Sequence, residues 1–180
     1  MKNNKKLRLL ILLLISTFGS LVNGQQHGQY NILLINQFDI GITGTKAAST
    51  NAILLKEPAF LKKFGAPVKK STEFSEPNDI ILTHYTYHGA DAWFQGKILE
   101  SITLSSAKYS VRFLNGSSIK VGDPISTVKK MFPLSWANRF GNHVSVVLQY
   151  GKILVDTNLI FDFDEQTKLI TSISCENNNS

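Results

Sequence analysis

Two stretches of the chain, QGKILESITL at 95–104 and QTKLITSISC at 166–175, decide the fold. Each opens on polar residues and continues as a strand pattern, in which apolar side chains favour alternate positions. The stretches match at a constant offset of 71 residues: Gln95 with Gln166, Lys97 with Lys168, Ile98 with Leu169, Ser101 with Ser172 and Ile102 with Ile173. We therefore predict two related strands, each returning from a turn.

A short helix is predicted ahead of each of these strands. The stretches EPAFLKKFGAP at 57–67 and DPISTVKKMFP at 123–133 both open on an acidic residue followed by proline, which suits a first helical turn. Gly65 suits the end of the first helix, and Pro133 stops the second. The pattern predicts two helix-plus-hairpin pseudo-repeats near 50–106 and 109–175. Chance similarity between two such segments is the alternative.

Further strand patterns occupy 30–35, 80–88, 109–113, 144–150, 153–155 and 159–163. Turns rich in Gly and Asn separate many neighbouring runs by two to four residues, which favours antiparallel pairing. The predicted fold class is α+β, a mainly antiparallel β-sheet with short helices packed on one face. One domain would span 50–175, after an N-terminal strand and loop region at 25–49 that begins with a polar tail at 25–29. A disordered tail is expected at 176–180.

A helix ending in F-G-x-P, followed by a strand, a turn and a returning x-G-K-[IL]-x-x-[IL] strand, resembles the beta-lactamase-inhibitory-protein-like architecture when it occurs twice. In its single form it resembles the small outer-membrane lipoproteins of the barrel-assembly machinery. The resemblance covers about 50–175 and implies a fold and a habit of binding proteins. One cysteine cannot form the inhibitor's disulfides, and no lipoprotein cysteine follows the leader, so no functional residue is carried over.

The first 24 residues have the pattern of a cleavable secretory signal. Lys2, Lys5, Lys6 and Arg8 precede an apolar stretch at 9–22, which is shorter than the ~20 apolar residues of a membrane-spanning helix. Small residues before the junction place cleavage between Gly24 and Gln25. The mature chain is then expected as a soluble periplasmic or extracellular protein with no membrane insertion; an uncleaved anchor is the alternative.

The leader also accounts for most of the net charge. The whole chain has 19 Lys and Arg against 13 Asp and Glu, a net charge of +6. Without the four basic residues of the leader the balance is 15 against 13, or +2. No long basic run remains, so the sequence argues against a nucleic-acid partner.

Catalytic and cofactor motifs are hard to find. The best metal candidates are His84, His88 and Asp91, but histidines four apart on a strand are separated by about 13 Å, too far for one ion. Cys175, the single cysteine, ends an apolar strand pattern and is expected to be buried. No catalytic residue, metal site or cofactor is therefore predicted.

Aromatic side chains provide the candidate binding surface. Tyr85 and Tyr87 share one face of the 80–88 strand, opposite His84 and His88, and Trp93 and Trp136 add two further large rings. Such residues are enriched in protein interfaces, so an exposed sheet face bearing Tyr85, Tyr87, Trp93 and Trp136 is the hypothesis. The alternative is that both faces of the strand are buried.

These features favour an exported, non-enzymatic protein-binding or inhibitor-like protein of the bacterial envelope. Two alternatives stay open: an exported hydrolase, with or without a metal ion at His84 and His88, and an accessory of envelope assembly. A protein partner is expected, but the sequence identifies neither that partner nor the oligomeric state.

Overall fold

The computed structural model describes residues 25–27, 30–45, 51–75 and 79–177. The predicted leader, including Gly24, lies outside these residues. Within the described part of the chain, no helix is both long and apolar enough to cross a membrane. The fold class is α+β and mostly β, with two sheets and a few short helices.

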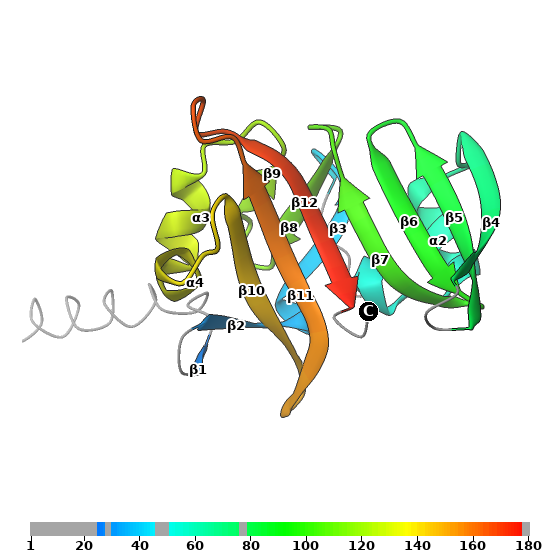
Figure 1. The fold of residues 1–180 in the computed structure, drawn as a ribbon, viewed down its shortest axis with the longest axis horizontal. Helices are drawn as coiled ribbons and strands as arrows, with labels where there is room; N and C mark the ends of the chain where they lie inside the picture. The colour runs from blue at the N-terminus through cyan, green and yellow to red at the C-terminus, as the bar shows by residue number, and fades with distance from the viewer. Residues whose placement is uncertain (1–24, 28–29, 46–50, 76–78, 178–180) are drawn as a thin grey trace, which may run out of the picture.

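A large, mostly antiparallel sheet forms the front of the molecule in the view of Figure 1. Its nine strands run in the order β1 (Gln25–His27), β2 (Tyr30–Leu34), β10 (His143–Tyr150), β11 (Ile153–Phe163), β12 (Ile170–Asn177), β7 (Ile98–Leu104), β6 (Ala90–Gln95), β5 (Ile80–Tyr87) and β4 (Lys69–Ser75). Every adjacent pair is antiparallel except β2 and β10, which are parallel. The sheet is therefore mixed rather than purely antiparallel.

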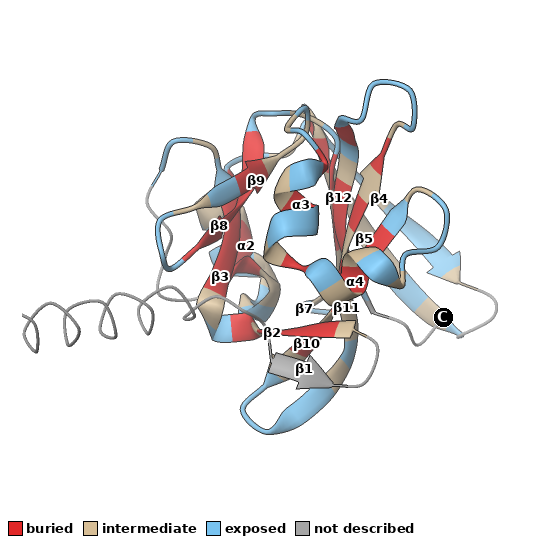
Figure 2. Cartoon of the chain, turned by 90° about the vertical axis from the view of Figure 1, so that its left-hand side faces the viewer, coloured by how far each residue is buried: buried red, intermediate tan, exposed pale blue. Residues whose placement is uncertain are grey.

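A second layer lies on one side of the large sheet, as Figures 1 and 2 show together. It holds a three-stranded sheet of β3 (Phe38–Ile42), β8 (Tyr109–Phe113) and β9 (Ser118–Lys120). It also holds the helices α2 (Glu57–Phe64), α3 (Ser126–Met131) and α4 (Pro133–Ala137), with the short 3-10 helices η1 (Ile35–Gln37) and η2 (Ala52–Leu54). The core fills the space between the layers, where the buried strand faces are red in Figure 2.

The second sheet was not anticipated, and its central strand explains why. The sequence of 109–113 alternates polar Ser110 and Arg112 with apolar residues, a pattern typical of a strand with one solvent-facing side. In the structure both polar residues are buried, at 1% and 6% exposure. Arg112 is buried because its guanidinium group binds Asp39 of β3, a contact between segments 73 residues apart.

The two predicted helices form, with one difference. Gly65 follows α2 with a φ of +84°, and its N–H donates to the Leu61 carbonyl, as expected of a glycine at a helix end. Pro133 ends α3 but is also the first residue of α4, a position where the missing N–H of proline costs nothing. The helix predicted at 123–133 is therefore α3, which begins only at Ser126 and not at Asp123-Pro124, and α4 follows it as a second short helix.

Both predicted polar tails are partly strand. Gln25–His27 pairs with β2 as β1, although 25–29 carries no apolar pattern. Glu176, expected in a disordered tail, pairs with Ser101 of β7 near the end of β12. Such segments pair through backbone hydrogen bonds, which hydrophobic patterning does not detect.

The ladder between β7 and β12 follows the sequence offset of 71. Thr103 corresponds to Ser174 at that offset, and the two residues face each other. On either side of them, Ile102 faces Cys175, which is the counterpart of Leu104 at offset 71. Leu104 in turn faces Ile173, which is the counterpart of Ile102.

The β6–β7 and β11–β12 hairpins, which lie on the two sides of this ladder, each contain a register shift. The β6–β7 pairing shifts register between Trp93 and Phe94, and the β11–β12 pairing shifts between Asp162 and Phe163. After the shift Phe94 faces Leu99 of β7, and Phe163 faces Ile170 of β12. Leu99 and Ile170 are again 71 residues apart. Gln95 and Gln166 do not correspond, because Gln95 ends β6 whereas Gln166 lies in the β11–β12 loop.

The buried cysteine yields a direct chemical prediction. Cys175 is 2% exposed, and burial, with a smaller contribution from the Glu176 carboxylate, raises the pKa of its thiol to about 12. We expect an aromatic disulfide reagent at neutral pH to leave the folded protein unlabelled and to label one thiol once denaturant is added. Absorbance of the released thiolate measures this. Rapid labelling of the native protein would contradict the structure.

Candidate functional site

The tyrosines proposed for an exposed surface lie in the core instead. Tyr85 and Tyr87 do share one face of β5, but they are only 2% and 6% exposed because that face is covered by α2. The Tyr85 hydroxyl donates to the Glu57 carboxylate, and the Lys70 ammonium lies 5.1 Å from the Tyr85 ring centre. Burial, followed by the hydrogen bond to Glu57, raises the pKa of Tyr85. The uncovered face of β5 is therefore the opposite one, which carries His84.

A stacked pair of rings stands on that uncovered face. His84 of β5 faces Trp93 of β6 in the strand register, and their rings lie 4.0 Å apart with planes 3° from parallel. The His84 Nε2 atom is 2.8 Å from Oδ1 of Asp91, two residues before Trp93 on the same side of β6. Adjacent antiparallel strands thus fix a histidine against an indole on one side and a carboxylate on the other.

The structure brings together only part of the predicted metal set. His84 and Asp91 meet, but His88 lies in the exposed turn after β5. Among residues 25–27, 30–45, 51–75 and 79–177 there is no group of three or more His, Cys, Asp or Glu side chains placed to hold a metal ion.

Trp136 belongs to a different part of the molecule. It lies on α4, in the layer that covers the sheet, where its ring packs 5.6 Å from that of Phe163. The Lys129 ammonium and the Arg139 guanidinium lie 5.6 and 4.2 Å from its ring centre. The predicted surface of four aromatic residues therefore does not exist, and Trp93 alone lies on the uncovered face.

Sequence reasoning missed a second polar group on the uncovered face. His143, Asp162 and Ser172 face one another across β10, β11 and β12. The Asp162 carboxylate contacts His143 Nδ1 and accepts a hydrogen bond of 2.5 Å from the Ser172 hydroxyl. The carboxylate occupies the middle position, so the histidine does not contact the hydroxyl as the base of a nucleophilic triad would. The alternation of Asp162 with Leu159, Phe161 and Phe163 was the available signal.

No described helix or strand covers this side of the large sheet, which faces the reader in Figure 1. We call it the open face and define it by the residues that the register places on the side of His84. From β4 to β10 they are Lys69, Ser71, Glu73, Ser75, Ile80, Leu82, His84, Thr86, Asp91, Trp93, Gln95, Ile98, Ser101, Thr103, Ser172, Ser174, Glu176, Leu154, Asn158, Ile160, Asp162, His143, Ser145, Val147 and Gln149. Small hydroxyl side chains are the largest group in this set, and its carboxylates outnumber its one lysine, Lys69.

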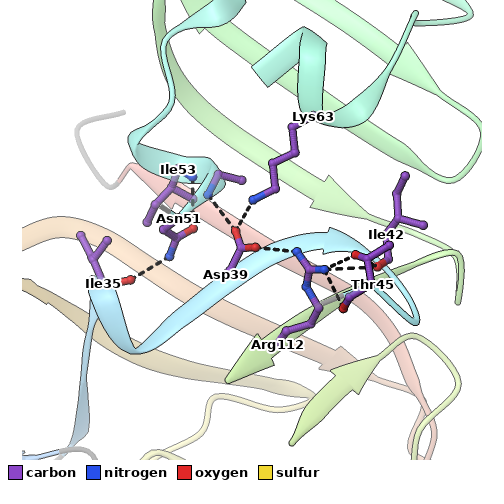
Figure 3. A network of polar contacts seen from close by, with 9 residues as sticks. Ile35, Asp39, Ile42, Thr45, Asn51, Ile53, Lys63 and Arg112 are labelled. Atoms are coloured by element: carbon purple, nitrogen blue, oxygen red, sulfur yellow. Dashed lines mark hydrogen bonds and ion pairs between the residues drawn. The ribbon is translucent and has the colours of Figure 1, made fainter. Parts of the chain in front are cut away.

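The most buried charges lie elsewhere, at the junction of the second sheet with α2 (Figure 3). Asp39, with a fully buried side chain, binds Arg112 Nη2 at 2.5 Å, the Lys63 ammonium and the Ala52 N–H. Arg112 Nη1 also donates to the Thr45 carbonyl at 2.9 Å. Burial lowers the pKa of Lys63, although contact with Asp39 opposes this. These contacts fasten β3, β8, η2 and α2 together.

A hollow of about 470 Å³ lies beside this network, and Arg112 forms part of its wall together with Thr45 and Ser110. The guanidinium nitrogens that the hollow would offer to a ligand already donate to Asp39, Thr45 and Ile42. We therefore assign the network a structural role and take the open face as the candidate site.

No family model, curated protein or solved structure matches this chain. The site must therefore be judged from its own geometry.

Proposed function

We propose that this chain is an exported, non-enzymatic binding protein of the bacterial envelope or its exterior, and that the open face binds a partner protein with a basic surface. The observation that carries the proposal is the stacked His84–Trp93 pair on a strand face that no described element covers. The predicted leader supports export. The hydrolase and assembly-accessory alternatives have no comparable observation in their favour.

The open face should lose little conformational entropy when it binds a partner. Its side chains stand on paired strands, and many of them are short Ser and Thr side chains that lose little rotamer freedom on binding. Trp93 is held by His84, so its large ring is already oriented for contact. Aromatic residues of this kind account for a large share of binding energy in known interfaces.

Charge selects the kind of partner. Asp91, Asp162 and Glu176 all lie on the open face, and Asp91 and Asp162 are fixed by histidine contacts. Carboxylates outnumber Lys69 on this face, so its field attracts lysine and arginine side chains and repels acidic surfaces. A basic protein surface is therefore the complementary partner.

We further propose that the open face is built from two pseudo-repeats, near 50–106 and 109–175, arranged as in the beta-lactamase-inhibitory-protein-like architecture. The support is the pairing of Thr103 with Ser174, its own counterpart at offset 71, and the register shift at corresponding positions of the two hairpins. Both features are what two related hairpins that meet along β7 and β12 would produce.

The test is a binding experiment with the mature protein immobilised and an envelope extract applied. Trp93→Ala should weaken capture of a specific partner about 30-fold or more, the effect of losing a central aromatic residue worth about 2 kcal/mol. Asp91→Asn should weaken it less and reduce its dependence on salt, because one charge contact is lost.

Leu114→Ala provides the matched control. Leu114 is 64% exposed in the turn between β8 and β9 of the second sheet, so its removal deletes a large exposed side chain outside the open face. Its affinity for the partner should equal that of the wild type. Capture that is equally strong with Trp93→Ala would contradict the proposal, as would the absence of any partner that Trp93 affects.

A further inference from the structure

The edge of the large sheet formed by β4 offers a second surface. β4 is the last strand in the sheet order, and among the described residues it pairs only with β5. Its seven residues, KKSTEFS, are mostly exposed. An edge strand of this length presents a row of backbone donors and acceptors to any other strand that approaches it.

Exposed apolar side chains lie beside this edge on the side of the sheet away from the open face. Phe74 of β4 faces Ile81 of β5, and both are about three-fifths exposed, at 60% and 62%. Val68, immediately before β4, lies on the same side as Phe74 and is 59% exposed. A folded monomer therefore leaves three large apolar side chains in water around one strand.

The sequence of this edge is complementary to itself in one antiparallel register. If a second copy pairs with β4 around a two-fold axis at Ser71, Lys69 faces Glu73 of the other copy twice. Val68 then faces Phe74 twice on the opposite side of the sheet. Directly opposed ion pairs and apolar pairs both stabilise antiparallel strands.

Neighbouring registers lack this match. An axis at Thr72 sets Lys69 against Ser75 and Lys70 against Phe74, and an axis at Lys70 leaves Glu73 outside the overlap with Lys69. Lysines on an edge usually prevent pairing, and Lys69 would do so in every register that lacks a facing carboxylate. Glu73 removes that penalty in the register centred on Ser71 alone.

We propose that two copies of this chain associate through antiparallel β4–β4 pairing centred on Ser71, which joins their large sheets edge to edge. The exposed Val68 and Phe74 side chains become covered, and Lys69 and Glu73 form two symmetric ion pairs. This interface involves the rim of the open face and does not depend on the binding function proposed for it.

A charge exchange tests the register. Sedimentation equilibrium of the mature protein should show a dimer. Lys69→Glu and Glu73→Lys should each raise its dissociation constant about tenfold or more, because like charges then face each other twice. The double variant Lys69→Glu/Glu73→Lys should restore the wild-type value. Lys152→Glu, at the exposed β10–β11 turn, has the same charge change as Lys69→Glu and should leave the dimer intact.

A crosslink tests the axis itself. Ser71→Cys would place two thiols opposite each other, at a Cα separation of about 4.5–5.5 Å that suits a disulfide. Cys175 is buried and does not compete. Mild oxidation should therefore give a covalent dimer of Ser71→Cys. The control variant Ser117→Cys, in the β8–β9 turn away from the proposed interface, should give none. A monomer at all concentrations, or single charge reversals that leave the dimer unchanged, would overturn the proposal.

Discussion

Asp39→Ala should lower the free energy of unfolding by about 3–5 kcal/mol, because it removes the carboxylate that binds both Arg112 and Lys63 in the interior. Asp39 also accepts the Ala52 N–H, so the substitution breaks contacts to β8, α2 and η2 together. Urea denaturation followed by circular dichroism measures the change.

Two companion variants separate charge from shape at this position. Asp39→Asn keeps the size of the side chain and an acceptor for Ala52, and we expect it to lose less stability than Asp39→Ala. Asp156→Ala removes an exposed carboxylate on β11 and should change the free energy of unfolding by no more than about 0.5 kcal/mol. A cost below 1 kcal/mol for Asp39→Ala would mean that the buried ion pairs contribute little.

Phe60→Ala should be comparably destabilising, at about 3–5 kcal/mol, since it empties the centre of the aromatic core. Phe60 is completely buried on α2, stacked 4.2 Å from Phe64 and edge-on to Phe94 at 5.1 Å. For a domain of this size we expect the midpoint of thermal unfolding to fall by about 10 °C. Differential scanning calorimetry measures it.

The matched comparison is Phe140→Ala, which deletes the same ring from an exposed position and should change stability by no more than about 0.5 kcal/mol. Phe60→Leu keeps most of the buried volume and should cost less than Phe60→Ala. Equal effects at Phe60 and Phe140 would contradict the packing described for α2.

Local patterns predicted the elements well where one strand face is apolar or a turn is marked by glycine. The strands β5, β7, β10 and β12 and the glycine at the end of α2 belong to this group. Their signals lie within about ten residues of sequence, so no knowledge of the tertiary structure was needed.

Predictions failed where the answer depended on distant partners. Alternation showed that Tyr85 and His84 occupy opposite faces of β5, but both are large polar-tipped rings, and only the position of α2 decides which face is covered. Arg112 is buried because Asp39 lies 73 residues away in the chain. An arginine inside a short apolar strand was the one local sign of this network.

The position of β12 has a consequence for how the chain folds as it is made. β12 is the last of the described strands in sequence, yet it lies inside the sheet, between β11 and β7. Until residues 170–177 have emerged from the ribosome, β7 and β11 each lack their neighbour on that side. The sheet therefore closes only when β12 joins both strands, through contacts between segments about 70 residues apart, which makes folding slow.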